Sequence, residues 1–228
     1  MKKALIIIAV LMFFAGLVIW LYPDAENFLY DRETAHRQER YFEEIDRDFE
    51  RYARLDELYE WMRKYNAELY EKRQSTLIDP FSYAQPNIDL SDYGIADNCV
   101  GYISIDKLNI TLPVYLGANE YNMSNGAAHL TETSFPIGGK NSNAVIAAHR
   151  GVTKVMFRNI HELETGDAVI IKNFREILTY RVCGIKIIYP TDVDQLLIQD
   201  GRDLVTLISC HPYGENYQRY VVYCERSP

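Results

Sequence analysis

The chain has 228 residues, of which 48% are hydrophobic and 13% aromatic, and its formal net charge is −8. This length suits one domain with a full core plus an appendage, and the apolar content excludes a disordered chain. Beyond the first few positions, lysines and arginines are dispersed among acidic residues, which argues against a nucleic-acid-binding surface.

The N-terminus predicts a membrane helix. Residues 4–22 read ALIIIAVLMFFAGLVIWLY and carry no charge. At about 1.5 Å per residue they nearly span a hydrocarbon core of ~30 Å. Lys2 and Lys3 precede the run while Asp24 and Glu26 follow it, so the positive-inside rule leaves the bulk of the protein outside the cytoplasm. A cleaved signal peptide is the alternative, but the run is longer than an h-region and its WLYP end is a poor cleavage site.

Residues 31–75 predict an amphipathic helix, broken at most once, because they contain neither Gly nor Pro. The apolar residues recur in steps of three and four, which is the spacing of one helical face. They are Tyr41, Ile45, Phe49, Tyr52, Leu55, Tyr59 and Met62. We interpret the helix as a membrane-proximal stalk that packs this stripe on a globular body; a coiled-coil partner site is the alternative.

The remainder of the chain is rich in predicted strands. Residues 75–94 carry two prolines and several Ser, Asp and Asn residues, which indicates a linker. From about residue 99, β-branched and aromatic runs alternate with turn residues, as in NAVIAAHRG, DLVTLISC and RYVVYCE. No long helical pattern alternates with these runs, so a parallel α/β fold is disfavoured and a closed or nearly closed β-barrel is expected.

Three residues at predicted strand ends are candidates for chemistry. Cys210 stands where a strand leaves the core, although a free Cys is also a common buried residue. A reactive thiolate needs a partner group, and His211 is a poor one because neighbouring residues of a strand point to opposite faces. His149 ends another strand and is the better base. Arg219 lies on the strand that follows Cys210, where it either reaches solvent or holds a developing oxyanion.

The cysteines argue against a structural metal site. They are irregularly spaced and include no CxxC pair, so a zinc site is not expected. If Cys210 is a working thiol, at most one disulfide can form among Cys99, Cys183 and Cys224.

These motifs resemble the sortases, membrane-anchored cysteine transpeptidases of Gram-positive bacteria. TLISC resembles the family's TLxTC signature, with Ser209 in place of threonine, and AAHRG and the downstream Arg219 stand where the family has its histidine and arginine. GAAHLTETSFPIGGKNSNAVIAAHRG resembles the class C, pilus-assembling branch. IDPFSY resembles the lid of that branch, so the resemblance makes Asp79, Pro80 and Phe81 the lid residues.

The resemblance implies a mainly β fold: a closed sortase-type barrel of about eight strands with an N-terminal helical segment and one transmembrane helix. It also implies a mechanism. Cys210 attacks the Thr–Gly carbonyl of an LPxTG-like sorting signal of a pilin or surface protein, His149 transfers protons, and Arg219 stabilises the oxyanion. The lid would pair Asp79 with Arg219 and cover Cys210 with Phe81. Neither a metal nor another cofactor is implied.

The acceptor and the class of protein stay open in the sequence. For a pilus polymerase the acceptor is a pilin lysine, and for a housekeeping sortase it is a cell-wall peptide amine. A membrane-anchored cysteine protease and a non-enzymatic β-barrel adhesin or scaffold are the further alternatives. The expected organisation is a cytoplasmic tip and anchor at 1–23, an extracellular helical stalk at 24–74, a lid and linker at 75–95, and a catalytic barrel at 96–228.

Overall fold

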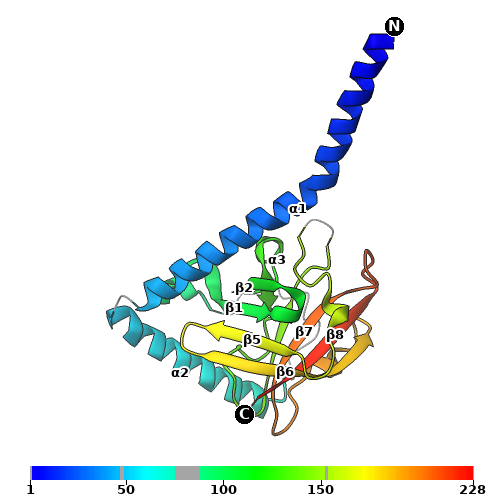
Figure 1. Ribbon diagram of the computed structural model, residues 1–228. Coiled ribbons are helices and arrows are strands. Elements are labelled where there is room, and N and C mark those ends of the chain that lie inside the picture. The colour runs from blue at the N-terminus through cyan, green and yellow to red at the C-terminus, as the bar shows by residue number, and fades with distance from the viewer. Residues whose placement is uncertain (1, 47–48, 75–87, 152–153, 228) are drawn as a thin grey trace.

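The C-terminal part of the chain forms a closed, eight-stranded barrel in the computed structural model (Figure 1). The structure describes residues 2–46, 49–74, 88–151 and 154–227. The barrel strands are β1 (Cys99–Ile105), β2 (Ile110–Leu116), β3 (Ala127–His129), β4 (Ser142–Ala147), β5 (Ala168–Asn173), β6 (Ile177–Ile188), β7 (Asp203–His211) and β8 (Gln218–Arg226). Their order around the barrel is β1-β2-β3-β4-β7-β8-β6-β5. The predicted closed, mainly β fold is therefore confirmed.

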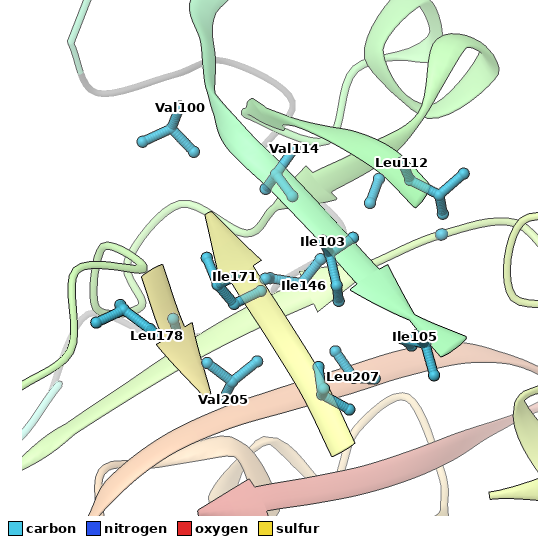
Figure 2. Packing of buried hydrophobic residues seen from close by; sticks show 14 of the residues in the cluster. Val100, Ile103, Ile105, Leu112, Val114, Ile146, Ile171, Leu178, Val205 and Leu207 are labelled. Carbon is cyan, nitrogen blue, oxygen red and sulfur yellow. The ribbon is translucent and has the colours of Figure 1, made fainter. Parts of the chain in front are cut away.

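The barrel is a mixed sheet around an aliphatic interior. β2 pairs with β3, and β4 with β7, in parallel, whereas the other recorded pairs are antiparallel. The β-branched runs supply the residues that fill the interior, since such side chains pack well on a pleated surface. Figure 2 shows part of this core: Val100, Ile103, Ile105, Leu112, Val114, Ile146, Ile171, Leu178, Val205 and Leu207. Each such side chain contributes about 1.5–3 kcal/mol when it is fully buried.

A long N-terminal helix carries the apolar run. α1 (Lys2–Asp46) is continuous and includes Pro23. Within the described residues it is the one helix that is long and apolar enough to cross a membrane, with a mean hydropathy of 2.8 in its most apolar window. Its apolar N-terminal half projects away from the barrel, and the following half runs past it (Figure 1). The predicted N-terminal spanning helix thus has its counterpart in the structure.

The second helix, α2 (Phe49–Glu71), returns along the barrel (Figure 1). It buries Leu58 and Met62 completely, while Tyr41 and Phe42 of α1 contact the ring of Tyr102 with centroids 5.7 and 6.0 Å away. The described members of the apolar stripe, Tyr41, Ile45, Leu55, Tyr59 and Met62, therefore belong to the hydrophobic core or pack against it. The shorter helices are η1 (Leu90–Tyr93), η2 (Ala96–Asn98), η3 (Asp106–Leu108), α3 (Glu120–Asn125), η4 (Ile160–Glu162) and η5 (Val193–Leu196).

The three adjacent strands β4, β7 and β8 have an apolar cluster on each face. The inner cluster fills the barrel and includes Ala148, Leu207 and Val222. The outer cluster lies on the opposite face and consists of Leu130, Val145, Ala147, Ile188, Leu196, Ile208 and Val221. Because side chains alternate along a strand, membership of one cluster assigns every second residue to that face. The same alternation determines which face of the sheet each candidate site residue occupies.

The proposed lid residues Asp79, Pro80 and Phe81 lie outside the described residues. The four cysteines are free thiols in the structure: Cys99 and Cys224 are buried, Cys210 is half-buried and Cys183 is exposed.

Candidate active site

Cys210 lies near the C-terminal end of β7 on the outer face. Ile208, two residues earlier, belongs to the outer cluster, so alternation assigns Cys210 to the same face. Cys210 is only half-buried, because the strand leaves the apolar cluster at this point. In the antiparallel pairing of β7 with β8, it lies directly opposite Arg219. The thiol and the guanidinium thus come from facing positions of one sheet.

His149 lies one residue beyond the paired end of the neighbouring strand. The last recorded pair of β4 and β7 joins Ala147 to Ile208. The strands stay in contact for one more residue, since the Ala148 amide donates to the Ile208 carbonyl (3.2 Å) and the Ser209 hydroxyl donates to the Ala148 carbonyl (2.8 Å). Ala148 faces the inner cluster, so alternation assigns His149 to the outer face, the same face as Cys210.

The His149 side chain is exposed and lines a pocket of about 240 Å³. The other lining residues are Ser124, Gly151, Lys154 and Met156. We refer to this space as the His149 pocket.

Arg219 enters the same face from β8. Val221, two residues later, belongs to the outer cluster, which assigns Arg219 to the outer face as well. Its Nη1 donates to the carbonyl oxygens of Asn216 (2.6 Å) and Gln218 (3.0 Å). These bonds hold the guanidinium at the base of the β7–β8 loop. A guanidinium is always charged and has five N–H donors, so it can also serve a nearby oxyanion.

A second polar group occupies the inner face at the same level. Arg150 Nη1 lies 3.2 Å from His211 Nδ1, and the Arg150 guanidinium and the His211 ring both lie against Tyr220, at 5.6 and 5.8 Å from its centroid. A guanidinium can only donate, so His211 Nδ1 accepts and the ring is neutral with its hydrogen on Nε2. Burial, with Arg150 beside the ring, lowers the pKa of His211. His211 is therefore turned away from Cys210.

Comparison with known proteins identifies the family. A sequence profile of the sortase domain matches residues 103–227, which is more than half of the chain. The chain belongs to the sortase family. Sortase A of Bacillus anthracis is 30% identical over 157 residues, which cover 67% of this chain and 72% of that protein.

The similar solved structures include class C sortases. Sortase C-1 of Streptococcus pneumoniae is 33% identical with a TM-score of 0.75, covering 85% of this chain and 98% of that one. Sortase C of Clostridium perfringens SM101 is 31% identical with a TM-score of 0.70, covering 85% and 99%. Sortase C1 of GBS Pilus Island 1 is 30% identical with a TM-score of 0.73, covering 85% and 92%. The predicted resemblance to sortases, and to class C in particular, is confirmed.

The other thiols of this sortase differ from Cys210 in their surroundings. Burial raises the pKa of Cys99 to about 12 and also raises the pKa of Cys224, so both are protonated, poorly nucleophilic thiols at neutral pH. Cys183 is exposed and lies 3.2 Å from Arg202 Nη2, on β6 and away from His149. Cys210 is thus the accessible thiol on the face that also carries the predicted histidine and arginine.

The other three histidines, His129, His36 and His161, lie in surroundings that differ from those of His149 and His211. His129 is buried, and its Nε2 donates to the Ser134 carbonyl at 2.9 Å. His36 in α1 and His161 in η4 are exposed. Within the described part of the chain, no three His, Cys, Asp or Glu side chains are grouped as a metal site requires.

Sequence reasoning missed two parts of this sortase's site. It did not find the walls of the His149 pocket from Ser124 and Lys154, because α3 and the loop after β4 meet only in the folded chain. It also did not pair Arg150 with His211. A signal for that pair was available: each follows directly after a residue assigned to the outer face, so both should lie on the inner face.

Proposed function

We propose that this sortase is a cysteine transpeptidase that cleaves an LPxTG-like sorting signal between Thr and Gly and transfers the acyl group to an amine. One observation carries the proposal: β4 and β7 end, and the adjacent β8 begins, at one end of the sheet, and alternation assigns Cys210, His149 and Arg219 to one face there. These are the residue types that thiol acyl transfer needs, namely a nucleophile, a proton-transfer group and an oxyanion donor.

The chemistry follows from these three residues. The Cys210 thiolate adds to the carbonyl carbon of the signal's threonine, and Arg219 donates to the oxyanion that forms. The C–N bond to glycine then breaks as His149 gives its proton to the leaving amine, which leaves a thioester on Cys210. An incoming amine adds to the thioester, loses a proton to His149 and expels the thiolate. The peptide bond is restored, so no oxidant or cofactor is consumed.

We take the acceptor to be a lysine of a pilin subunit. The support is the set of class C structural neighbours, one of which is named for a pilus island. A cell-wall peptide amine is the competing acceptor, since sortase A proteins are also among the relatives. The test offers full-length protein in lipid nanodiscs an LPxTG peptide with no amine, with a lysine-containing pilin peptide, or with a cell-wall peptide amine.

The expected result is an acyl adduct on Cys210 in mass spectra and a product that depends on the lysine acceptor. Faster transfer to the cell-wall amine would instead identify a housekeeping sortase. Hydrolysis that is indifferent to amines would identify a protease, and the absence of any Cys210 adduct would overturn the transpeptidase proposal.

The lid forms part of the same proposal: Asp79 pairs with Arg219, and Phe81, held by Pro80, covers Cys210 until substrate displaces it. The support is the IDPFSY sequence and the placement of Gln74, four residues before this sequence begins. Gln74 is buried, accepts from the Ile198 amide (2.6 Å) and donates to the Glu132 carbonyl (3.2 Å). Gln74 therefore lies beside the connection that carries Leu196 of the outer cluster.

Replacing Asp79 and Phe81 by alanine should raise the alkylation rate of Cys210 and the hydrolysis of sorting-signal peptides. The experiment needs a Cys183→Ser background, because Cys183 is also exposed. Unchanged alkylation of Cys210 in the double variant would rule out the lid.

The membrane arrangement proposed is single-pass, with a cytoplasmic N-terminus and an extracellular catalytic domain. Lys2 and Lys3 at the start of α1, against Asp24 and Glu26 after the apolar run, support this orientation.

A further inference from the structure

The part of α1 that follows the apolar run contacts the loop that follows His149. The Val155 amide donates to Asn27 Oδ1 at 3.1 Å, and Lys154 Nζ lies 4.7 Å from the centroid of the Tyr30 ring. Asn27 is fixed at its other end too, because its Nδ2 donates to the Pro23 carbonyl at 2.8 Å. The loop therefore contacts α1 in two ways: the Val155 amide donates to Asn27, and the Lys154 ammonium lies over the Tyr30 ring.

The same contacts hold the walls of the His149 pocket. Ser124, at the end of α3, and Lys154 line this pocket from two sides, and Lys154 Nζ donates to the Ser124 carbonyl at 2.6 Å. Tyr30 reaches both walls: its ring lies under Lys154, and its hydroxyl donates to the Asn125 carbonyl at 2.7 Å. The Tyr30 side chain is 8% exposed, so it is packed into this junction rather than lying on the surface.

The base and the tip of the loop are held differently. At its base the loop bonds to itself, since the Phe157 amide donates to the His149 carbonyl (3.1 Å) and Arg158 Nε donates to the Gly151 carbonyl (2.9 Å). At its tip, Lys154 and Val155 contact α1 and α3. The loop begins at His149, so the contacts that Lys154 and Val155 make at its tip affect the position of His149.

We propose that Asn27 and Tyr30 are positioning residues for His149, so that the anchoring helix is also a structural element of the active site. Asn27 lies five residues beyond Tyr22, or about 7–8 Å along a helix axis. The His149 pocket is therefore built at the level where α1 leaves the membrane. The activity part of this inference rests on the proposed transpeptidase function, whereas the structural part does not.

The test uses the full chain in nanodiscs and two readouts. Asn27→Leu removes the acceptor for the Val155 amide, whereas Asn27→Asp keeps an acceptor oxygen at the same position. Tyr30→Phe removes only the hydroxyl. Arg32→Ala, at an exposed position of the same helix, is the matched control.

Hydrogen exchange of residues 154–158 should become about ten-fold faster in Asn27→Leu and in an Asn27→Leu/Tyr30→Phe double variant, and should stay at the wild-type rate in Arg32→Ala. Asn27→Asp should restore most of the protection. Unchanged exchange in the double variant would overturn the proposal, whether or not the protein processes a sorting signal.

For peptide transfer, we expect kcat to fall about five- to twenty-fold in the double variant while KM stays within about two-fold. The reason is that His149 transfers a proton in the reaction, whereas other groups bind the sorting signal. Asn27→Asp should recover most of kcat. A Lys154→Met variant, which disturbs the tip from the loop side, should show the same faster exchange and the same fall in kcat. A loss confined to KM, or equal losses in Asn27→Asp and Asn27→Leu, would contradict positioning of His149.

Discussion

The two faces of the β4–β7–β8 sheet differ sharply at the end where Cys210 lies. Alternation assigns exposed His149, half-buried Cys210 and Arg219 to the outer face, beyond an apolar cluster. On the inner face, Arg150 and His211 bond to each other against Tyr220. The residues of the two groups are neighbours in the chain, yet the pleat of the sheet separates them. Because side chains alternate along a strand, the outer face can carry the proposed catalytic residues while the inner face carries a hydrogen-bonded pair that holds the same strand ends.

Cys210 and Ser209 offer the strongest test of this separation. Cys210→Ala should lower peptide transfer by at least about 10³-fold, because the variant lacks the nucleophile that forms the proposed thioester. Its free energy of unfolding should change by less than about 1 kcal/mol, since the side chain is small and half-buried. Ser209→Ala should do the reverse: the Ala148 carbonyl loses a donor, which destabilises by about 1–3 kcal/mol, while transfer stays within about ten-fold.

Transfer measured by mass spectrometry and unfolding measured by denaturant titration separate the two variants. Comparable losses of activity in Cys210→Ala and Ser209→Ala would mean that the two faces of the sheet do not separate catalysis from stability.

His149 and His211 lie on opposite faces and should differ in their effect on the reaction. His149→Ala should lower kcat by about 10²–10⁴-fold, the usual contribution of a proton-transfer group. His211→Ala should lower it only a few-fold, and should cost about 1–2 kcal/mol of stability because the Arg150 guanidinium loses an acceptor. Rates in the pre-steady state, where thioester formation is seen directly, give the cleanest measurement. A larger loss of activity in His211→Ala than in His149→Ala would show that His149 is not the base.

Replacement by lysine should have different effects at Arg219 and at Arg150. Arg219→Lys keeps the charge but loses the planar fork, so transfer should fall by about 10²-fold, near the effect of losing one oxyanion donor. Arg150→Lys should mainly lower stability, because Arg150 bonds to both the Arg158 carbonyl and His211. Peptide kinetics and thermal unfolding on both variants test this. Equal kinetic losses would show that the inner pair also takes part in the reaction.

Much of this arrangement could be predicted from local pattern. The uncharged run of 19 residues, the helical stripe and the β-branched runs indicated the spanning helix, the packed helix and the barrel, because each depends on periodicity within one segment. Cys210, His149 and Arg219 were singled out because each lies near a strand end, and their catalytic roles stay a prediction. Alternation alone made His211 a poor partner for Cys210, and in the structure His211 pairs with Arg150 instead.

The remainder depended on contacts between distant segments. The continuation of α1 through Pro23 was not predicted, because a proline after an apolar run also suits a break. Asn27 and Val155 are 128 positions apart, and no periodicity links them. The His149 pocket likewise needs α3 and the loop after β4 to meet. The parallel pairing of β4 with β7, which brings the strand before His149 alongside the strand of Cys210, is a property of topology that the runs themselves do not encode.

A third histidine gives the smallest expected effect and a contrast with both faces. His129 is wholly buried, stacks on Phe135 and donates to the Ser134 carbonyl; burial lowers its pKa to about 4. The unfolded chain binds a proton near pH 6.5 but the folded chain does not, so stability is full above that pH and falls as pH decreases from about 6.5 towards 4. Between pH 7 and pH 5 the loss should be about 2 kcal/mol. Denaturant titrations of the wild type and His129→Gln should differ in this slope, whereas exposed His161→Gln should retain it. A wild-type slope that survives in His129→Gln would place the responsible proton elsewhere.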